Sequence, residues 1–297
     1  MLPRGPSDGR FAPSPTGDLH VGNLRTALLA WLFARSAGAR FLVRMEDLDT
    51  GRVRPGAAER QLADLRAIGL DWDGPVVRQS QRLAAYGDAI AALEAGGHLY
   101  ECFCTRAEIR AAASAPHGPL PEGAYPGTCL RLTAGERGER RAAGRSPALR
   151  VRAAAARMSF EDRVLGRVEA VVDDFVVRRN DGAPAYNLAV VVDDAAQGIG
   201  AVVRGADLAE TTPRQLLLAQ LLGLPAPTYA HVPLVLGPDG ARLAKRHGAV
   251  TLRDLDPTAA LRWMARSLGL PEVDDPRDLV DRFVPAALPR QPTVWGA

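Results

Sequence analysis

The sequence has 297 residues, of which 47% are hydrophobic and 24% are charged, as in an ordinary globular protein that forms one large domain or two modest ones. The formal net charge of +3 permits a nucleic-acid partner but does not require one. No apolar run approaches the roughly 20 residues of a membrane-spanning helix, and the first residues lack the apolar segment of a signal peptide. We therefore predict a cytoplasmic protein without membrane contacts.

The first hundred residues predict alternating strands and helices. A short strand ends near residues 10–12, and an apolar helix follows from about Gly22 to Ala37. The segment 39–47 (ARFLVRMED) is predicted as a buried strand with acidic residues at its carboxyl end. Helices are expected over 55–68 and 82–95. This βαβ order is typical of a parallel sheet covered by helices.

The pattern changes near His98. From there to about Arg150 the sequence holds all three cysteines and many Pro and Gly residues, which predicts an insertion. The stretch 168–194 is predicted as a β-hairpin, with strands FVVRR and AYNLAVVV and a turn at 180–182. A strand over 199–205, a helix over 211–224 and a helix over 257–268 follow. Residues 271–297 are expected to be loosely attached.

The turn between the first strand and the first helix is the most specific local feature. Its sequence RFAPSPTGDLHVGN (residues 10–23) contains two prolines and two glycines. A helix N-terminus carries about half a positive charge and several unpaired N–H groups. His20 and Gly22 in such a turn bring the backbone close to phosphates. An isolated H-x-G sequence is more often an ordinary surface turn, so the choice between the two interpretations depends on the whole stretch 10–23.

The whole string resembles the adenylate-binding motif of class I aminoacyl-tRNA synthetases, in the form used by the glutamyl and glutaminyl branch. The motif that the family writes as HIGH is here His20-Val21-Gly22-Asn23. Further motifs of the family follow in the same order: RMEDLD (44–49), APAYNLAVVVDD (183–194), VVRGADL (202–208) and RLAKR (242–246). The resemblance implies an α/β fold, a Rossmann-type parallel sheet split by a connective insertion. It also implies an enzyme, a ligase that uses ATP with Mg²⁺ to form glutamyl-adenylate.

With this resemblance, the domains are expected at 1–97 (first half of the catalytic domain), 98–170 (insertion), 171–255 (second half) and 256–297 (a short C-terminal segment). The RLAKR loop departs from the family's KMSKS pattern, because Arg242 replaces the first Lys and Ala244 and Arg246 replace the two Ser residues. The loop thus keeps its charge and loses its hydroxyl donors.

Glutamate binding requires cations for two carboxylates and an anion for the ammonium group. Arginine binds a carboxylate in bidentate geometry, and Arg10 and Arg204 stand at predicted strand ends that face the expected crevice. Glu46 suits the ammonium group. By resemblance the glutamate site comprises Arg10, Ala12, Ser14, Glu46, Tyr186 and Arg204.

The α-phosphate of ATP needs preorganised positive donors and no protein nucleophile. By resemblance the ATP site comprises His20, Gly22, Asn23 and Lys245, with His20 and Lys245 as catalytic residues. A single loop lysine or a single Arg–Glu pair would more often be an ordinary surface feature.

Cys102, Cys104 and Cys129 are candidate thiolate ligands of a closed tetrahedral zinc site. The alternative is three buried, unreactive thiols. His98, His117 and Tyr125 are candidates for a fourth ligand, and ligand chemistry alone favours a histidine. The order C-x-C then Y-x₃-C, however, resembles the zinc site of one subfamily, the glutamyl-queuosine tRNA(Asp) synthetases. That resemblance implies one structural Zn²⁺ with Tyr125 as the fourth ligand.

The acceptor of glutamate is inferred from the length of the chain. It ends about 50 residues after RLAKR, whereas a glutamyl-tRNA synthetase carries a further anticodon-binding region. The resemblance therefore implies a catalytic domain that acts alone, as a monomer, on queuosine in the anticodon of tRNA(Asp). Two alternatives stay open: a truncated glutamyl-tRNA synthetase that charges tRNA(Glu), and a non-catalytic glutamate- or nucleotide-binding paralogue. Arginines of the insertion either hold RNA phosphates or form a solvated loop (Arg131, Arg137, Arg140, Arg141 and Arg145).

Overall fold

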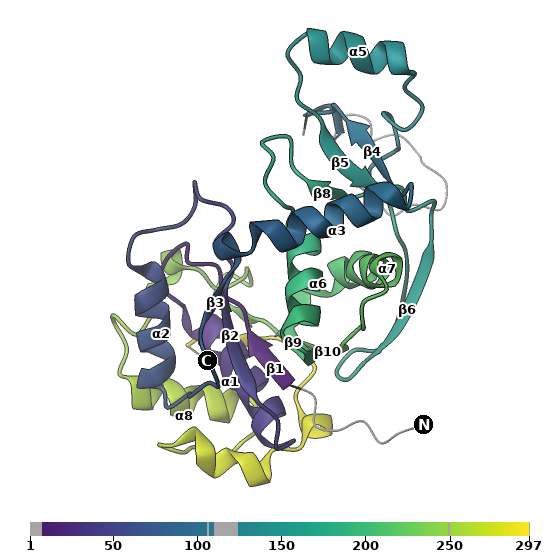
Figure 1. The fold of residues 1–297 in the computed structure, drawn as a ribbon. Helices are drawn as coiled ribbons and strands as arrows, with labels where there is room; N and C mark the ends of the chain where they lie inside the picture. The colour runs from purple at the N-terminus through teal and green to yellow at the C-terminus, as the bar shows by residue number, and fades with distance from the viewer. Residues whose placement is uncertain (1–7, 106, 110–123, 249, 297) are drawn as a thin grey trace.

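The computed structural model describes residues 8–105, 107–109, 124–248 and 250–296 (Figure 1). In this part of the chain the largest sheet has seven strands in the order β3-β2-β1-β9-β10-β6-β7. Neighbouring strands pair in parallel, except β6 and β7, which form an antiparallel hairpin. The strands are β1 (Asp8–Phe11), β2 (Phe41–Met45), β3 (Val77–Arg78), β6 (Arg157–Asp162), β7 (Gly166–Val171), β9 (Ile199–Gly205) and β10 (Thr228–Val232). The predicted α/β fold with a parallel sheet is confirmed.

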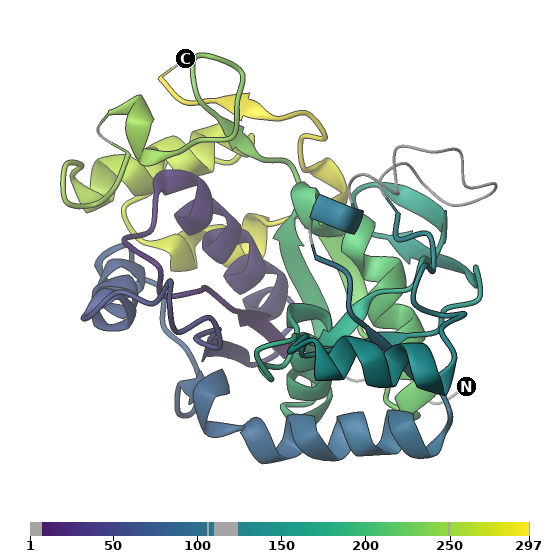
Figure 2. The ribbon, with the colours of Figure 1, turned by 90° about the horizontal axis from the view of Figure 1, so that it is seen from above.

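Helices cover both faces of this sheet. The core on one face joins α1 (Val21–Arg35) to α8 (Pro257–Ser267) and to the C-terminal segment. The core on the other face joins α3 (Leu83–Ala95), α6 (Tyr186–Ala196) and α7 (Thr212–Leu222). Figure 2 shows this division, with the purple α1 beside the yellow-green α8 and the blue α3 on the opposite side. Helix α2 (Ala57–Ala67) packs beside α1.

The insertion forms a small sheet of its own. It pairs β4 (Leu99–Cys102), β5 (Ala148–Val151) and β8 (Val176–Arg178) in antiparallel order. The exposed helix α5 (Ala134–Ala142) lies beyond this sheet, far from α8 in Figure 1. Strand β6 and all but the last residue of β7 fall inside the range 98–170 predicted for the insertion, yet they pair with the main sheet, whereas β8 of the small sheet lies outside that range. The boundary predicted at residue 170 therefore does not separate the two sheets.

The hairpin predicted over 168–194 is wrong in its second strand. The turn at 180–182 exists, with Gly182 at a φ of +86°, but residues 186–196 form the helix α6. A short apolar run such as AVVV fits a buried strand or a buried helix equally well. Leu188, Ala189 and Val190 are buried against α3 and α7, so tertiary packing overrides the strand preference of the valines.

The C-terminal segment is packed onto the core, contrary to the prediction of loose attachment. Its 3₁₀ turns η4 (Pro276–Arg282) and η5 (Pro285–Ala287) place Leu279 and Phe283 in the core beside α1. The short strand β12 (Thr293–Val294) pairs with β11 (Val235–Leu236). The guanidinium of Arg25 donates to the Ser267 carbonyl and to Thr293 Oγ1, which ties α1 to this segment.

Candidate active site

A cavity of about 570 Å³ opens at the carboxyl ends of β1, β2, β9 and β10. Strands β1 and β9 are neighbours, while their other partners, β2 and β10, lie on opposite sides. This is a topological switch point, where open α/β sheets bind ligands. The predicted residues in its lining are Arg10, Ala12, Ser14, His20, Gly22, Asn23, Glu46, Tyr186 and Arg204. The structure therefore brings the predicted glutamate residues and, of the predicted ATP residues, all but Lys245 into one cavity.

For Lys245 the structure describes only the backbone, which begins the 3₁₀ turn η3 (Lys245–His247). The same loop reaches the cavity through Arg242, whose Nη1 donates to Asp207 Oδ2 at 2.6 Å. Arg242 and Asp207 both line the cavity.

The turn between β1 and α1 is held by hydrogen bonds at both of its ends. His20 is the N-cap of α1: its Nδ1 accepts from the Asn23 amide at 3.2 Å, and Asn23 Oδ1 accepts from the His20 amide at 3.3 Å. Because Nδ1 accepts, the neutral imidazole carries its proton on Nε2. A Cβ added at Gly22 would lie 3.0 Å from His20 Nδ1, so only glycine leaves the ring in place without strain. Gln61 donates to the carbonyls of Ser14 and Gly17 at 3.1 and 2.7 Å.

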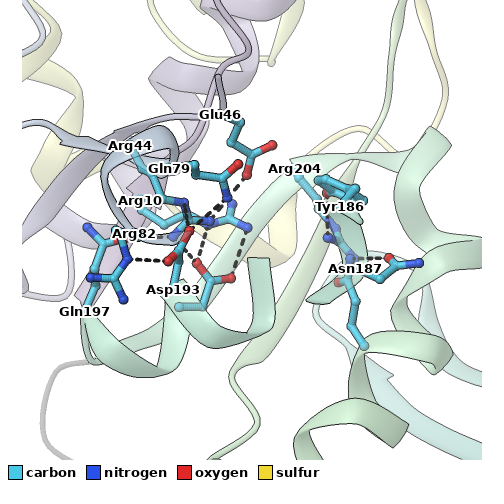
Figure 3. Close-up of polar contacts among 12 residues, drawn as sticks. Arg10, Arg44, Glu46, Gln79, Arg82, Tyr186, Asn187, Asp193, Gln197 and Arg204 are labelled. Carbon is cyan, nitrogen blue, oxygen red and sulfur yellow. Dashed lines mark hydrogen bonds and ion pairs between the residues drawn. The ribbon is translucent and has the colours of Figure 1, made fainter. Parts of the chain in front are cut away.

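Arg10 is held by a buried ion-pair network (Figure 3). Its Nε and Nη2 donate to the two carboxylate oxygens of Asp194 at 3.2 and 3.3 Å. Arg44 Nη1 donates to Asp194 at 2.7 Å and to Gln197 at 2.7 Å, and its Nη2 donates to Glu46 at 3.4 Å. Asp194 thus joins the cavity arginine to an arginine beneath it. The sequence placed Asp194 within a motif but assigned it no role.

Asp193, the neighbour of Asp194, anchors the same network to other elements. It accepts from Gln79 Nε2 at 2.8 Å, Arg82 Nε at 2.5 Å and Tyr86 Oη at 2.9 Å. These contacts bind α6 to α3 and to the turn after β3. The network therefore fixes α6, whose first residue is Tyr186.

Arg204 lies apart from this network in Figure 3, beside Tyr186. It is 4% exposed. Arg204 Nε donates to His231 Nε2 at 3.0 Å. Its Nη2 donates to Thr212 Oγ1 at 2.7 Å, and its Nη1 donates to Tyr186 Oη at 3.4 Å. The sequence analysis predicted Arg204 but neither His231 nor Thr212.

Burial and neighbouring charges set the protonation of two cavity residues. Burial raises the pKa of Glu46 above its usual value, although the charges of Arg44 and Arg10 oppose this. Burial and the charge of Glu46 raise the pKa of Tyr186, so its hydroxyl stays neutral. A substrate ammonium group beside Glu46 would favour the carboxylate form, as an opposite charge does.

The acids that follow Glu46 have structural contacts. Asp47 accepts from the backbone amide and the hydroxyl of Ser80 at 2.8 and 2.7 Å, and Asp49 lies 3.9 Å from Arg179. Asp47 therefore holds the turn after β3 in place, and Asp49 faces an arginine.

The three cysteines lie together in the insertion. Their sulfur atoms are all within 4.8 Å of one another. Tyr125 Oη lies 3.4 Å from Cys102 Sγ and 3.5 Å from Cys104 Sγ. Zn–S bonds of 2.3 Å in a tetrahedron place ligand atoms about 3.8 Å apart, so three sulfurs and one phenol oxygen fit a zinc ion. Among the described residues His98 does not join the cluster, and His117 lies outside them.

The basic stretch of the insertion already contains ion pairs. Arg141 contacts Glu101, and Arg145 contacts Glu108 at 2.7 Å. Helix α5 begins with a capping box between Thr133 and Glu136; Arg141 is exposed, while Arg137 and Arg140 are half-buried. These contacts are compatible with a phosphate-binding surface and with a solvated helix, so both predictions stay open.

Comparison with known proteins gives consistent matches. The family model "tRNA synthetases class I (E and Q), catalytic domain" matches residues 8–270. A glutamyl-Q tRNA(Asp) synthetase of Nocardia farcinica is 63% identical over 96% of this chain and 92% of its own length. The one of Symbiobacterium thermophilum is 51% identical over 96% of this chain and 94% of its own length.

A solved structure supports the fold. The glutamate tRNA ligase of Elizabethkingia meningosepticum, crystallised with its amino acid, superposes with a TM-score of 0.83 at 27% identity, over 98% of this chain and 67% of that chain. Among the described residues, no helix has the length and apolar character needed to cross a membrane.

Proposed function

The chain belongs to the class I tRNA synthetases of the glutamyl and glutaminyl branch and, within them, to the glutamyl-Q tRNA(Asp) synthetases, and from this membership we propose the reaction that follows. The enzyme, a ligase, activates glutamate with ATP in the absence of tRNA. It then transfers glutamate to queuosine in the anticodon of tRNA(Asp), in the cytoplasm. The observation that carries this proposal is that one cavity is lined by arginines suited to glutamate and by a helix N-terminus suited to phosphates.

In the first half-reaction an oxygen of the α-carboxylate of glutamate attacks the α-phosphorus of ATP, and pyrophosphate leaves. Arg10 and Arg204 each bind one carboxylate of glutamate, while Glu46 accepts from its ammonium group. Ala12 and Ser14, in the turn after β1, lie against the amino acid, and Tyr186 donates a hydrogen bond to it. The buried contacts of Asp194 with Arg10 support this arrangement, because they hold the guanidinium before glutamate arrives.

The phosphates of ATP lie at the N-terminus of α1. His20 donates from Nε2, and the backbone at Gly22 and Asn23 approaches the phosphates closely. Lys245 supplies a mobile cation for the leaving pyrophosphate, and ATP arrives with Mg²⁺ on its phosphates. Fixed donors of this kind stabilise the charge that develops on the α-phosphate.

In the second half-reaction a hydroxyl oxygen of queuosine attacks the acyl carbon of glutamyl-adenylate, and AMP leaves. The identity of this acceptor is supported by the two relatives at 63% and 51% identity that are named for it. The arginines of α5, of which Arg141 is exposed, are suited to phosphates of the anticodon arm.

A structural zinc ion completes the proposal. Cys102, Cys104, Tyr125 and Cys129 are its ligands, supported by the sulfur separations and the position of the phenol oxygen. Burial raises the pKa of Cys104 to about 12 in the absence of metal. A bound divalent cation would supply the positive charge that the thiolates need.

The test follows labelled glutamate. We expect glutamate-dependent exchange of pyrophosphate into ATP without RNA, and then label on tRNA(Asp) that carries queuosine. The same tRNA without queuosine and tRNA(Glu) should stay unlabelled. Arg10→Gln should abolish exchange, whereas the exposed Arg167→Gln, which also removes one arginine, should not.

Two results would reject the proposal. Label on tRNA(Glu), or exchange only in its presence, would indicate a glutamyl-tRNA synthetase. Binding of glutamate or ATP without exchange under any condition would indicate a binding paralogue.

A further inference from the structure

Arg204 differs from Arg10 in how its charge is compensated. Arg10 forms a bidentate ion pair with Asp194. Among the described residues, the hydrogen-bond acceptors around the Arg204 guanidinium are all neutral: an imidazole, two hydroxyls and the Leu208 carbonyl. These groups fix the orientation of the guanidinium without neutralising it. The guanidinium therefore has no carboxylate among these direct partners, and a carboxylate in the cavity can take that place.

The imidazole belongs to His231, which stands opposite Arg204 in the register of β9 and β10. His231 is fully buried and is absent from the cavity lining. On its far side Nδ1 lies 2.6 Å from Asp162 Oδ2, on the neighbouring strand β6. Asp162, His231 and Arg204 thus form a row across three adjacent strands, and Arg204 is the member that reaches the cavity.

The hydrogen-bond partners of Asp162 and His231 determine which of their atoms carry a proton. Asp162 also accepts from the backbone amides of Val164 and Leu165; burial alone would raise its pKa, but these bonds and that from His231 hold it below the usual value. A carboxylate only accepts, so Nδ1 of His231 carries the proton. Nε2 is then left as an acceptor for Arg204 Nε–H. Burial and the charge of Arg204 lower the pKa of His231, which favours the neutral ring.

The surroundings hold the ring in this orientation. Tyr229 stacks on His231 with a ring separation of 5.8 Å and an angle of 6°, and Phe160 meets its edge. The same Tyr229 ring lies 5.4 Å from the guanidinium carbon of Arg204. The imidazole can therefore neither turn nor be replaced by water without repacking.

We propose that His231, oriented by Asp162, is a positioning residue for glutamate specificity: it fixes Arg204 so that the uncompensated guanidinium faces one carboxylate of the substrate. This inference rests on the proposed function, in which Arg204 binds glutamate. It predicts that the affinity for glutamate depends on the acceptor at Nε2, while the affinity for ATP does not.

Two substitutions of His231 by an amide side chain test its contact with Asp162 and its contact with Arg204 separately. His231→Asn reaches about as far as Nδ1, so it retains a contact with Asp162 and loses Arg204. His231→Gln reaches about as far as Nε2, so it retains an acceptor for Arg204. The loss of one charged hydrogen bond corresponds to a factor of about 10 to 100 in binding. We expect His231→Asn to raise the KM for glutamate by this factor in pyrophosphate exchange, and His231→Gln by less than about threefold.

The KM for ATP should stay within about twofold in both variants, and both should unfold at similar urea concentrations. Equal effects of the two variants on the KM for glutamate, equal changes in the KM values for glutamate and ATP, or loss of folding in both variants would overturn the positioning role. Absence of glutamate-dependent exchange in the wild type would instead reject the proposed function, so the two failures are distinguishable.

Discussion

Replacement of Asp194 by Asn tests the buried network beneath the cavity. The carboxylate of Asp194 neutralises Arg10 and Arg44, with its nearest contact at 2.7 Å, and the side chains of Asp194 and Arg44 are 9% and 0% exposed. In the described network Arg10, Arg44 and Arg82 face Asp193, Asp194 and Glu46, so the substitution leaves one buried positive charge in excess. Breaking a buried pair from one side costs about 3 to 5 kcal/mol. We expect that loss in the free energy of unfolding of Asp194→Asn.

Urea unfolding measures this loss. A slope of about 3 kcal/mol per molar urea, at the upper end for small proteins, converts it to a midpoint lower by about 1 to 1.7 M. Glu169→Gln is the matched control, because the Arg167–Glu169 pair is at least 63% exposed at both ends and should change stability by less than about 0.5 kcal/mol. A midpoint for Asp194→Asn that equals that of Glu169→Gln would refute the reasoning.

The difference between wild type and Asp194→Asn should also depend on pH in one direction. Burial opposes ionisation of Asp194, but Arg10 and Arg44 hold its pKa below the unfolded value of 3.8. A lowered pKa in the folded state contributes stability above the unfolded value, and this stability is lost as the pH falls through the folded value. The difference should therefore be constant from pH 5 to 8 and should shrink below about pH 4. A difference that grew with acid would contradict the assignment.

Three further outcomes are expected. Cys104→Ser should lower the zinc content of the purified protein from about one ion per chain, measured by elemental analysis; no zinc in the wild type would count against the site. Gly22→Ala should slow pyrophosphate exchange by about fivefold or more, because its Cβ would lie 3.0 Å from the N-cap imidazole and an N-cap is worth about 1 kcal/mol; Gly87→Ala, with nothing within 4 Å, is the control. Leu279→Ala should cost about 2 to 5 kcal/mol of stability, and Leu83→Ala, at 55% exposure, should cost far less; equal costs would show that the C-terminal segment is not part of the core.

The elements of the fold that could be predicted are those with a strong local pattern. Buried parallel strands read as continuous apolar runs, which is why β2 and β9 were found within two residues of their ends. The turn before α1 was predicted because Pro and Gly residues at fixed spacing have few alternatives. The hairpin of β6 and β7 was missed, because its alternating charged residues resemble an exposed insertion and its pairing with β10 has no local signal.

The second layer of the site could not be predicted for a related reason. Asp162 and His231 are 69 positions apart, and Gln61 is 47 positions from the carbonyl that it binds. No spacing rule connects such residues, since their contact depends on strand order. A polar residue inside an otherwise apolar strand, such as His231 in TYAHV, was the one available signal.

The segment 186–194, predicted as a strand and found in helix α6, shows how secondary structure sets the positions of the cavity residues. Tyr186 and Asp194 are eight residues apart, which is about 26 Å in a strand but about 12 Å in a helix. A helix also places residues seven positions apart on the same face, so α6 directs Tyr186 and Asp193 toward one side. Asp193 and Asp194 can then bind Arg82, Arg44 and Arg10 while the N-terminus of the same helix presents Tyr186 to the cavity. With a strand over 186–194, Tyr186 and the buried carboxylates would lie too far apart to serve the same cavity.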